Sequence, residues 1–565
     1  MNFTYSTIKP TIPRDILWFV FNMNAEDEQI GMDERLRTTL RSTHVCQGWR
    51  TLILKSPSIW GKLLYLDCLH GGVNGTVYPH NLEMMYEVLR RSVQAPLWIQ
   101  ATGGRVGYGG RQDRAVQSHA FLIQILSHHW DRIERLTLYQ YGKQIHDPED
   151  HDLRSILSCL NGAAPSLREC HIENVSKRSA YQRRNPDYSS PLFSNSAPSL
   201  RYLCSDYLTI SVHASWLPSL TTLITTPVTS GFSSTVRSTL KVLSQIPNLI
   251  YLELGHAMDS LQSINDVENC PTANLPRLEY MGIKTSARNA LAFVEKTKRS
   301  GTGCIVNIKA TFDIRDVCDP SSFEHVALTL YNESFAKNIR TKYSTGLEFA
   351  FMGFSVGGIT LTDKDCLVDG IYMDLDPEMN SNGLYLSLLW PTNGSDWSPI
   401  VPPGVVDSIL KFSIFHEYTN ITVLRLTSDL DQDVVQGIRT TGLGTTYPID
   451  TLECDSFNSF GILTQSKDLQ SSSLTSRLFT RVKNLSVDVS EHDDSNSSFC
   501  IQGLQRVTKL RNKMGINIES LNIYGCRMGV DYIETFSETL GLRQLWMRWD
   551  IGGGEYKDTV HVYSR

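Results

Sequence analysis

The sequence predicts an α/β protein in which a short helical N-terminal module precedes a long, irregular repeat scaffold. Three observations support this fold class. Apolar residues recur at helical spacing near the N-terminus, a Pro-x-Leu-x-x-Leu element recurs through the middle of the chain, and helix-like stretches separate its copies. We therefore expect a first domain at residues 10–69 and a second at 71–565, joined by the turn-rich run HGGVNG from His70.

The first predicted helix is the segment PRDILWFVFNM from Pro13. Proline suits the first helical turn because the N–H that it lacks would have no partner there, and Asp15 complements the positive end of the helix. The apolar residues are too many for one stripe; they are Ile16, Leu17, Phe19, Val20, Phe21 and Met23. We expect this helix to contact both its own domain and a partner, and burial within its own core is the alternative.

A second helix is predicted from about Leu36 to Lys55, after an acidic interval, NAEDEQIGMDER, that we interpret as an exposed connection. Its apolar face comprises Leu40, Val45, Cys46, Trp49, Leu52 and Ile53. The run Ser56-Pro57-Ser58 should stop this helix, and Trp60 should fold back as an aromatic plug.

Taken in order, these N-terminal motifs resemble an F-box. They are Ile12-Pro13-Arg14-Asp15-Ile16-Leu17, then Val45-Cys46-x-x-Trp49-Arg50, then Ser56-Pro57-x-x-Trp60, and they are similar to the F-box-like domains of mushroom-forming fungi. The resemblance covers residues 10–69 and implies a three-helix fold that docks on the adaptor subunit of an SCF ubiquitin ligase. The residues that it implies for adaptor binding are Pro13, Ile16, Leu17, Val45, Cys46 and Trp49. Their spacing does not settle which of them face the adaptor and which face the core of the box.

The downstream repeat has the form Pro-x-Leu-x-x-Leu. Its copies are PSLRECHI from Pro165, PSLRYLCS from Pro198, PSLTTLIT from Pro218, PNLIYLEL from Pro247 and PRLEYMGI from Pro276. Their first leucines are 33, 20, 29 and 29 residues apart, as in an irregular solenoid. Similar apolar patterns without the proline occur in RIERLTLY, NITVLRLT, VKNLSVDV, NIESLNIY and LRQLWMRW.

Each Leu-x-Leu pattern predicts a short strand with alternate side chains in the core, and the proline marks the turn before it. Helix-like stretches lie between copies, such as TVRSTLKVLSQI from Thr235 and ARNALAFVEKTKRS from Ala287. A strand and a helix per stacked unit is the leucine-rich-repeat arrangement. Regularity fails over 305–403, which we interpret as an embellished, strand-rich part of the same scaffold. The alternative is an ordinary α/β domain with leucine-rich strands.

The composition of the chain limits the classes of partner that we expect. The net charge of −6 and the pI of about 6.2 favour neither nucleic acid nor an anionic membrane. A secretory signal is not evident, and the uncharged run 349–361 is too short to span a bilayer, so we expect a cytoplasmic or nuclear protein. The 12 cysteines form no CxxC pair, which indicates reduced thiols rather than a zinc or disulfide framework.

Candidate chemistry is sparse. The loop TGGRVGYGGR from Thr102 lacks the Gly-Lys-Ser/Thr of a phosphate cradle. His128 and His129 are adjacent, which fits a helix end leading into the next strand better than a shared site. We therefore predict no catalytic residue, cofactor or metal.

Two functions remain, with an enzyme whose active site is dispersed as a third and minor alternative. In the first, the chain is an SCF substrate receptor that binds the adaptor and an unidentified client protein. In the second, it is a non-catalytic interaction scaffold unrelated to ubiquitin transfer.

Overall fold

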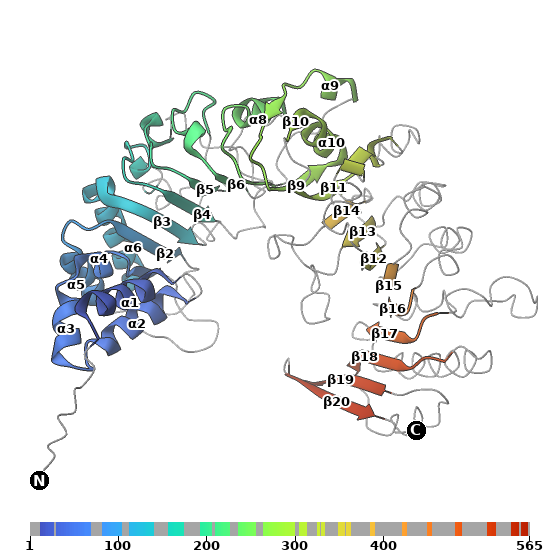
Figure 1. Cartoon of the computed structure of the whole chain (residues 1–565), viewed down its shortest axis with the longest axis horizontal. Helices are drawn as coiled ribbons and strands as arrows, with labels where there is room; N and C mark the ends of the chain where they lie inside the picture. The colour runs from blue at the N-terminus through green and yellow to red at the C-terminus, as the bar shows by residue number, and fades with distance from the viewer. Residues whose placement is uncertain are drawn as a thin grey trace, which may run out of the picture. The chain divides into compact units, whose positions relative to one another are not determined.

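The chain folds into helices and mostly parallel strands, which confirms the predicted α/β class. It forms two compact units. Figure 1 labels helices and strands of both. Unit 1 comprises Met1–Asp259, Pro271–Leu278 and Thr297–Ser300, and unit 2 comprises Ser260–Cys270, Glu279–Lys296 and Gly301–Arg565. The computed structural model describes residues 12–27, 30–68, 82–103, 112–139, 156, 158–173, 192–205, 210–225, 236–255, 264–299, 304–312, 325–327, 329–330, 332–333, 349–355, 358–362, 385–389, 421–426, 449–454, 481–488, 517–526, 544–552 and 555–562.

Four helices open unit 1: α1 (Arg14–Glu26), α2 (Met32–Ser42), α3 (Gln47–Leu54) and α4 (Pro57–Gly61). The predicted single helix over 36–55 is wrong, because residues 43–46 interrupt it and separate α2 from α3. The extended backbone of Cys46 places its Sγ 3.4 Å from the N–H of Trp49, which caps α3. The predicted exposed connection over 24–35 is also partly wrong, since α2 begins inside it and buries Met32.

The helices pack on a small aromatic core. The Phe21 ring of α1 meets the Trp49 ring of α3 edge-on, with 5.0 Å between centroids. Trp60 of α4 is buried, as predicted for a plug, and its indole N–H donates to the carbonyl of Ile53 at 2.9 Å. This hydrogen bond satisfies the one polar atom of an otherwise apolar ring, so Trp60 closes the module without an orphaned donor.

A parallel sheet follows, in which each strand pairs with the next one in the sequence. Its strands are β1 (Leu64–Cys68), β2 (Leu97–Gly103), β3 (Ile133–Tyr139), β4 (Glu169–Glu173), β5 (Tyr202–Ser205), β6 (Thr222–Thr225) and β7 (Tyr251–Leu254). The predicted strands at RIERLTLY and at the copies from Pro165, Pro198, Pro218 and Pro247 are confirmed. One fully buried row crosses the sheet in register: Leu64, Ile99, Leu136, Cys170, Leu203, Leu223 and Leu252.

The remaining elements of unit 1 lie between these strands or in its later segments. They are α5 (Leu82–Ser92), α6 (Gln112–His128), the short 3-10 helices η1 (Trp130–Arg132), η2 (Leu192–Asn195) and η3 (Leu217–Ser219), and α8 (Val236–Leu243), with β8 (Ala273–Asn274) paired to β10 (Thr297–Lys298). The helix predicted from Thr235 is confirmed as α8, whose buried face includes Val236, Leu240 and Leu243. The regularly spaced apolar residues of that segment therefore form the face on which α8 packs.

Unit 2 contains α9 (Ile264–Glu268), α10 (Ala287–Lys296) and a further set of strands. These strands are β9 (Tyr280–Ser286), β11 (Ile305–Thr311), β12 (Phe349–Ser355), β13 (Gly358–Thr362), β14 (Tyr385–Leu389), β15 (Ile421–Leu426), β16 (Thr451–Cys454), β17 (Asn484–Asp488), β18 (Ser520–Cys526), β19 (Gln544–Gly552) and β20 (Glu555–Val562). The helix predicted from Ala287 and the strands predicted at the copy from Pro276 and at the later leucine-rich patterns are confirmed.

The irregular stretch 305–403 departs from sequential pairing. Spatially the strands run β9, β11, β14, β13, β12, β15, and sequential pairing resumes from β15 to β20. β13 is antiparallel to both of its neighbours, and β20 is antiparallel to β19. The stretch predicted to be strand-rich thus contains strands, but they join the sheet in inverted order.

Within unit 1, elements on the two sides of the predicted domain boundary contact each other. β1 lies within 10–69, yet it pairs with β2 beyond that boundary, with Leu64 opposite Ile99. A Cβ built on Gly61 would lie 2.3 Å from the carbonyl oxygen of Pro96, so α4 touches the backbone that leads into β2. The helices therefore pack directly on the start of the sheet.

Candidate functional site

Helix α1 is apolar on two opposite faces. Phe21, Asn22 and Ala25 are buried against the other helices. The opposite side carries Ile16, Phe19, Val20 and Met23, whose side chains are 50%, 55%, 52% and 52% exposed. Their spacing of i, i+3, i+4 and i+7 places them on one stripe of the helix. We call these four residues the outer stripe.

The structure separates the six predicted adaptor-binding residues into two groups. Pro13, Ile16, Val45 and Cys46 are exposed, with Val45 at 62%. Leu17 and Trp49 are half-buried. Trp49 packs against Phe21, so its ring serves the core of the module at least in part. The outer stripe shares only Ile16 with the predicted set.

Sequence reasoning missed Phe19, Val20 and Met23 as site residues. The signal was present, because these three positions continue the helical spacing from Ile16. Phe21 and Ala25 are equally apolar, however, and lie on the opposite face. Only the packing of α2, α3 and α4 shows which apolar face of α1 is covered.

Polar contacts anchor the covered side of α1. The Asn24 amide donates to the carbonyl of Arg35 at 3.3 Å and to the hydroxyl of Thr39 at 3.1 Å. The guanidinium of Arg35 is buried and donates in turn to the carbonyl of Ala25 at 3.1 Å. A cation at these last carbonyls complements the negative end of the helix. These bonds orient α1 so that the outer stripe faces away from α2.

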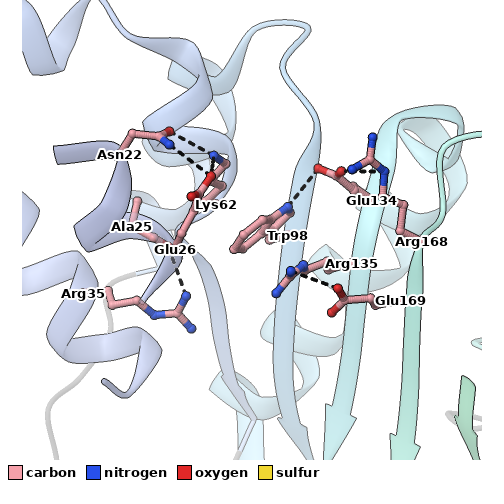
Figure 2. Close-up of polar contacts among 10 residues, drawn as sticks. All are labelled: Asn22, Ala25, Glu26, Arg35, Lys62, Trp98, Glu134, Arg135, Arg168 and Glu169. Atoms are coloured by element: carbon pink, nitrogen blue, oxygen red, sulfur yellow. Dashed lines mark hydrogen bonds and ion pairs between the residues drawn. The ribbon is translucent and has the colours of Figure 1, made fainter. Parts of the chain in front are cut away.

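A second anchor joins α1 to the residue that follows α4. The Lys62 ammonium donates to Asn22 Oδ1 at 2.9 Å and contacts Glu26, which also accepts from the Asn22 amide at 3.0 Å. Burial disfavours the ionised Glu26 carboxylate, but the hydrogen bond and charge of Lys62 outweigh burial and lower its pKa. Glu26 therefore stays ionised, and Figure 2 shows the three side chains converging.

The two candidate chemical sites of the sequence are the pair His128 and His129 and the glycine-rich segment from Thr102. His128 ends α6 and is followed by η1 and β3, which confirms the helix-end reading. Thr102 and Gly103, the first two residues of the predicted loop, end β2 instead, and residues 104–111 lie outside the described residues. Within the described part of the chain, no three His, Cys, Asp or Glu side chains gather as a metal site, and no helix is long and apolar enough to cross a membrane.

Seven cysteines in the described part of the chain form no disulfide bond: Cys46, Cys159, Cys170, Cys204, Cys270, Cys304 and Cys454. Burial raises the pKa of the Cys170 thiol to about 12, which keeps it protonated. Cys170 therefore acts as a small core residue in the buried row of strands β1–β7.

Comparison with known proteins finds no family model that matches this chain and no matching curated sequence. Function must therefore be inferred from the chain's own geometry. The feature that stands out is the outer stripe, because large apolar side chains on one helix face are normally covered by other protein.

Proposed function

We propose that this protein is the substrate-recognition subunit of an SCF-type ubiquitin ligase. The observation that carries the proposal is the outer stripe, four large apolar side chains each at least half exposed on one face of α1. Leaving such a stripe in water forgoes about 25 cal/mol for each Å² of apolar surface that a partner could cover. The stripe therefore fits the helix-in-groove mode of recognition.

The F-box resemblance supplies the identity of the proposed partner. Of the residues that it implies, Pro13 and Ile16 lie at the N-terminal end of α1, and Val45 and Cys46 immediately precede α3. All four are exposed, as a docking role requires. In the proposal the SCF adaptor covers the outer stripe together with Val45.

We infer that the strands beyond the box belong to an irregular leucine-rich-repeat-like solenoid that holds a client protein. The support is the buried row of mostly leucine side chains that repeats in register from strand to strand. The chain supplies no catalytic side chain in this proposal. It raises the local concentration of client lysines near a ubiquitin-charged enzyme, in the cytoplasm, the nucleus or both.

Docking is tested with the purified full chain and the purified SCF adaptor. Replacing Ile16 and Val20 with alanine should weaken binding at least a hundredfold, since two half-exposed anchors would be truncated. Val93→Ala is the matched control, because Val93 is 59% exposed but lies just beyond α5. Circular dichroism should be unchanged in both variants. A wild-type chain that fails to retain the adaptor would refute the proposal.

Receptor and scaffold roles are separated in cells. A substrate receptor should shorten the lifetime of a co-purifying partner, and blocking the proteasome should restore that lifetime. The Ile16 and Val20 double variant should leave the partner stable. A partner that stays bound with the same lifetime in all conditions would support the scaffold function instead.

A further inference from the structure

Lys62 links helix α1 to the sheet. Its side chain is only 13% exposed, and its ammonium contacts Asn22 and Glu26 of α1. The same ammonium lies 5.2 Å from the centre of the Trp98 ring in β2. An ammonium with this little access to water requires compensating contacts, and here they come from α1 on one side and an aromatic face on the other.

Trp98 continues the link into the next strands. Figure 2 shows its ring between Lys62 and Arg135 of β3, and the Arg135 guanidinium lies 3.9 Å from the ring centre. The indole N–H donates to a Glu134 carboxylate oxygen at 3.0 Å. The ring is buried, so its cation contacts and its hydrogen bond allow little freedom of orientation.

Two ion pairs extend the contacts to the edge of β4. Arg168 lies 3.0 Å from Glu134, and Arg135 lies 2.9 Å from Glu169. Trp98, Arg135 and Glu169 are also direct neighbours in strand register. A continuous chain of contacts therefore runs from α1 to β4, entirely within unit 1.

Backbone packing beside this chain points the same way. Gly61, the last residue of α4, leaves no room for a Cβ against the Pro96 carbonyl. The Arg91 guanidinium of α5 lies 4.9 Å from the centre of the Trp60 ring. Helices and sheet thus meet through close backbone contact as well as through side chains, which is unlike two domains on a flexible tether.

We propose that Lys62 and Trp98 are positioning residues that hold the outer stripe of α1 in one orientation relative to strands β1–β4. The functional consequence, though not the rigidity, rests on the proposed ligase role. A partner docked on the stripe and a client held by the strands would keep a fixed separation, which proximity catalysis requires.

The test measures the separation directly in the full chain. A donor and an acceptor fluorophore are attached through non-natural amino acids at the exposed positions Asp15 of α1 and Ala163, six residues before β4, so that the native cysteines stay unlabelled. Time-resolved energy transfer then gives the distribution of distances. We expect one narrow distribution for the parent chain and at least a twofold wider one for Lys62→Met and Trp98→Leu.

Three further variants make the result specific. Lys62→Arg keeps the cation and should restore the narrow distribution, whereas Lys55→Met removes an exposed lysine charge and should change nothing. Glu26→Gln keeps the shape of the side chain but removes the charge opposite Lys62, so it should widen the distribution. If Lys62→Met and Trp98→Leu prevent folding, the width of the distribution in Glu26→Gln tests the proposal.

Folded variants with distributions as narrow as the parent would overturn the proposal. Adaptor affinity should stay within threefold in every positioning variant, because the outer stripe is untouched, while client ubiquitination should fall about tenfold. Failure of the parent chain to bind the adaptor would defeat the ligase role and leave the distance result standing. The two ideas therefore fail separately.

Discussion

The Trp49 ring meets the Phe21 ring edge-on at 5.0 Å and 69°, on the side of α1 that faces the other helices. Phe19, two positions earlier, is 55% exposed on the opposite side. Two phenylalanines of one helix thus belong to different surfaces. One holds the module together, and the other is available to a partner, which makes their effects on stability and binding separable.

Phe21→Ala should lower the free energy of unfolding by about 3–5 kcal/mol, because it removes a buried ring and its contact with Trp49. Phe19→Ala should change it by less than about 0.5 kcal/mol, since that ring is largely in water. Urea denaturation of the full chain measures both. Adaptor binding should be lost in Phe19→Ala, and equal stability losses in the two variants would contradict the two-faced helix.

Gly61→Ala should destabilise the chain by about 1–3 kcal/mol, because the added methyl would overlap backbone that cannot move cheaply. Gly48 of α3 provides the control, since its Cβ would meet only Cys46 Sγ, at 3.9 Å. Gly48→Ala should instead stabilise by up to about 1 kcal/mol through helix propensity. Thermal unfolding compares the pair, and a neutral Gly61→Ala would show that α4 can draw back from Pro96.

Val93 has a left-handed backbone, with φ of 48°, just beyond the C-terminus of α5. This conformation is costly for a β-branched residue and free of steric cost for glycine. Because the Val93 side chain is exposed, its removal loses little packing. Val93→Gly should therefore stabilise the chain by about 0.5–1 kcal/mol relative to Val93→Ala, which keeps the strain. Denaturation midpoints that rank alanine above glycine would contradict this account.

Stability should depend on pH through His129. Burial and the neighbouring charge of Arg132 lower the pKa of His129 below the ordinary value of 6.5. The unfolded chain therefore binds a proton near pH 6.5 that folded His129 does not bind, so its contribution to stability is present above that pH and lost as the pH falls below it. His129→Gln should flatten this part of the profile, measured as the denaturation midpoint from pH 7.5 to 5. An unchanged slope would assign the acid sensitivity to other groups.

Most strands were predictable from sequence because their signal is local. The alternation in PNLIYLEL places Leu252 and Leu254 on one face of β7, and neighbouring strands with a similar pattern complete the buried row. The helices at 236–243 and 287–296 were predictable for the same reason, through apolar spacing within a single turn or two.

Sequence spacing failed at one local helix cap and at the pairing of strands far apart in the chain. The helix expected over 36–55 breaks because Cys46 caps α3 with its own sulfur, and the inverted strand order around β13 depends on pairing between segments far apart in the chain. Local pattern carries no information about which strand arrives beside which.

The sequence by itself determined that the apolar residues of α1 are too many for one stripe, that leucine-rich strands follow it, and that motifs resembling an F-box occur in order. Only the tertiary structure decided that Ile16, Phe19, Val20 and Met23 stay exposed while Phe21 and Ala25 are covered. It also joined Lys62 and Trp98 across 36 residues of sequence. The physical reason is that burial is a property of neighbours. A helix of apolar residues can bury any of its faces, and the packing of α2, α3 and α4 selects one.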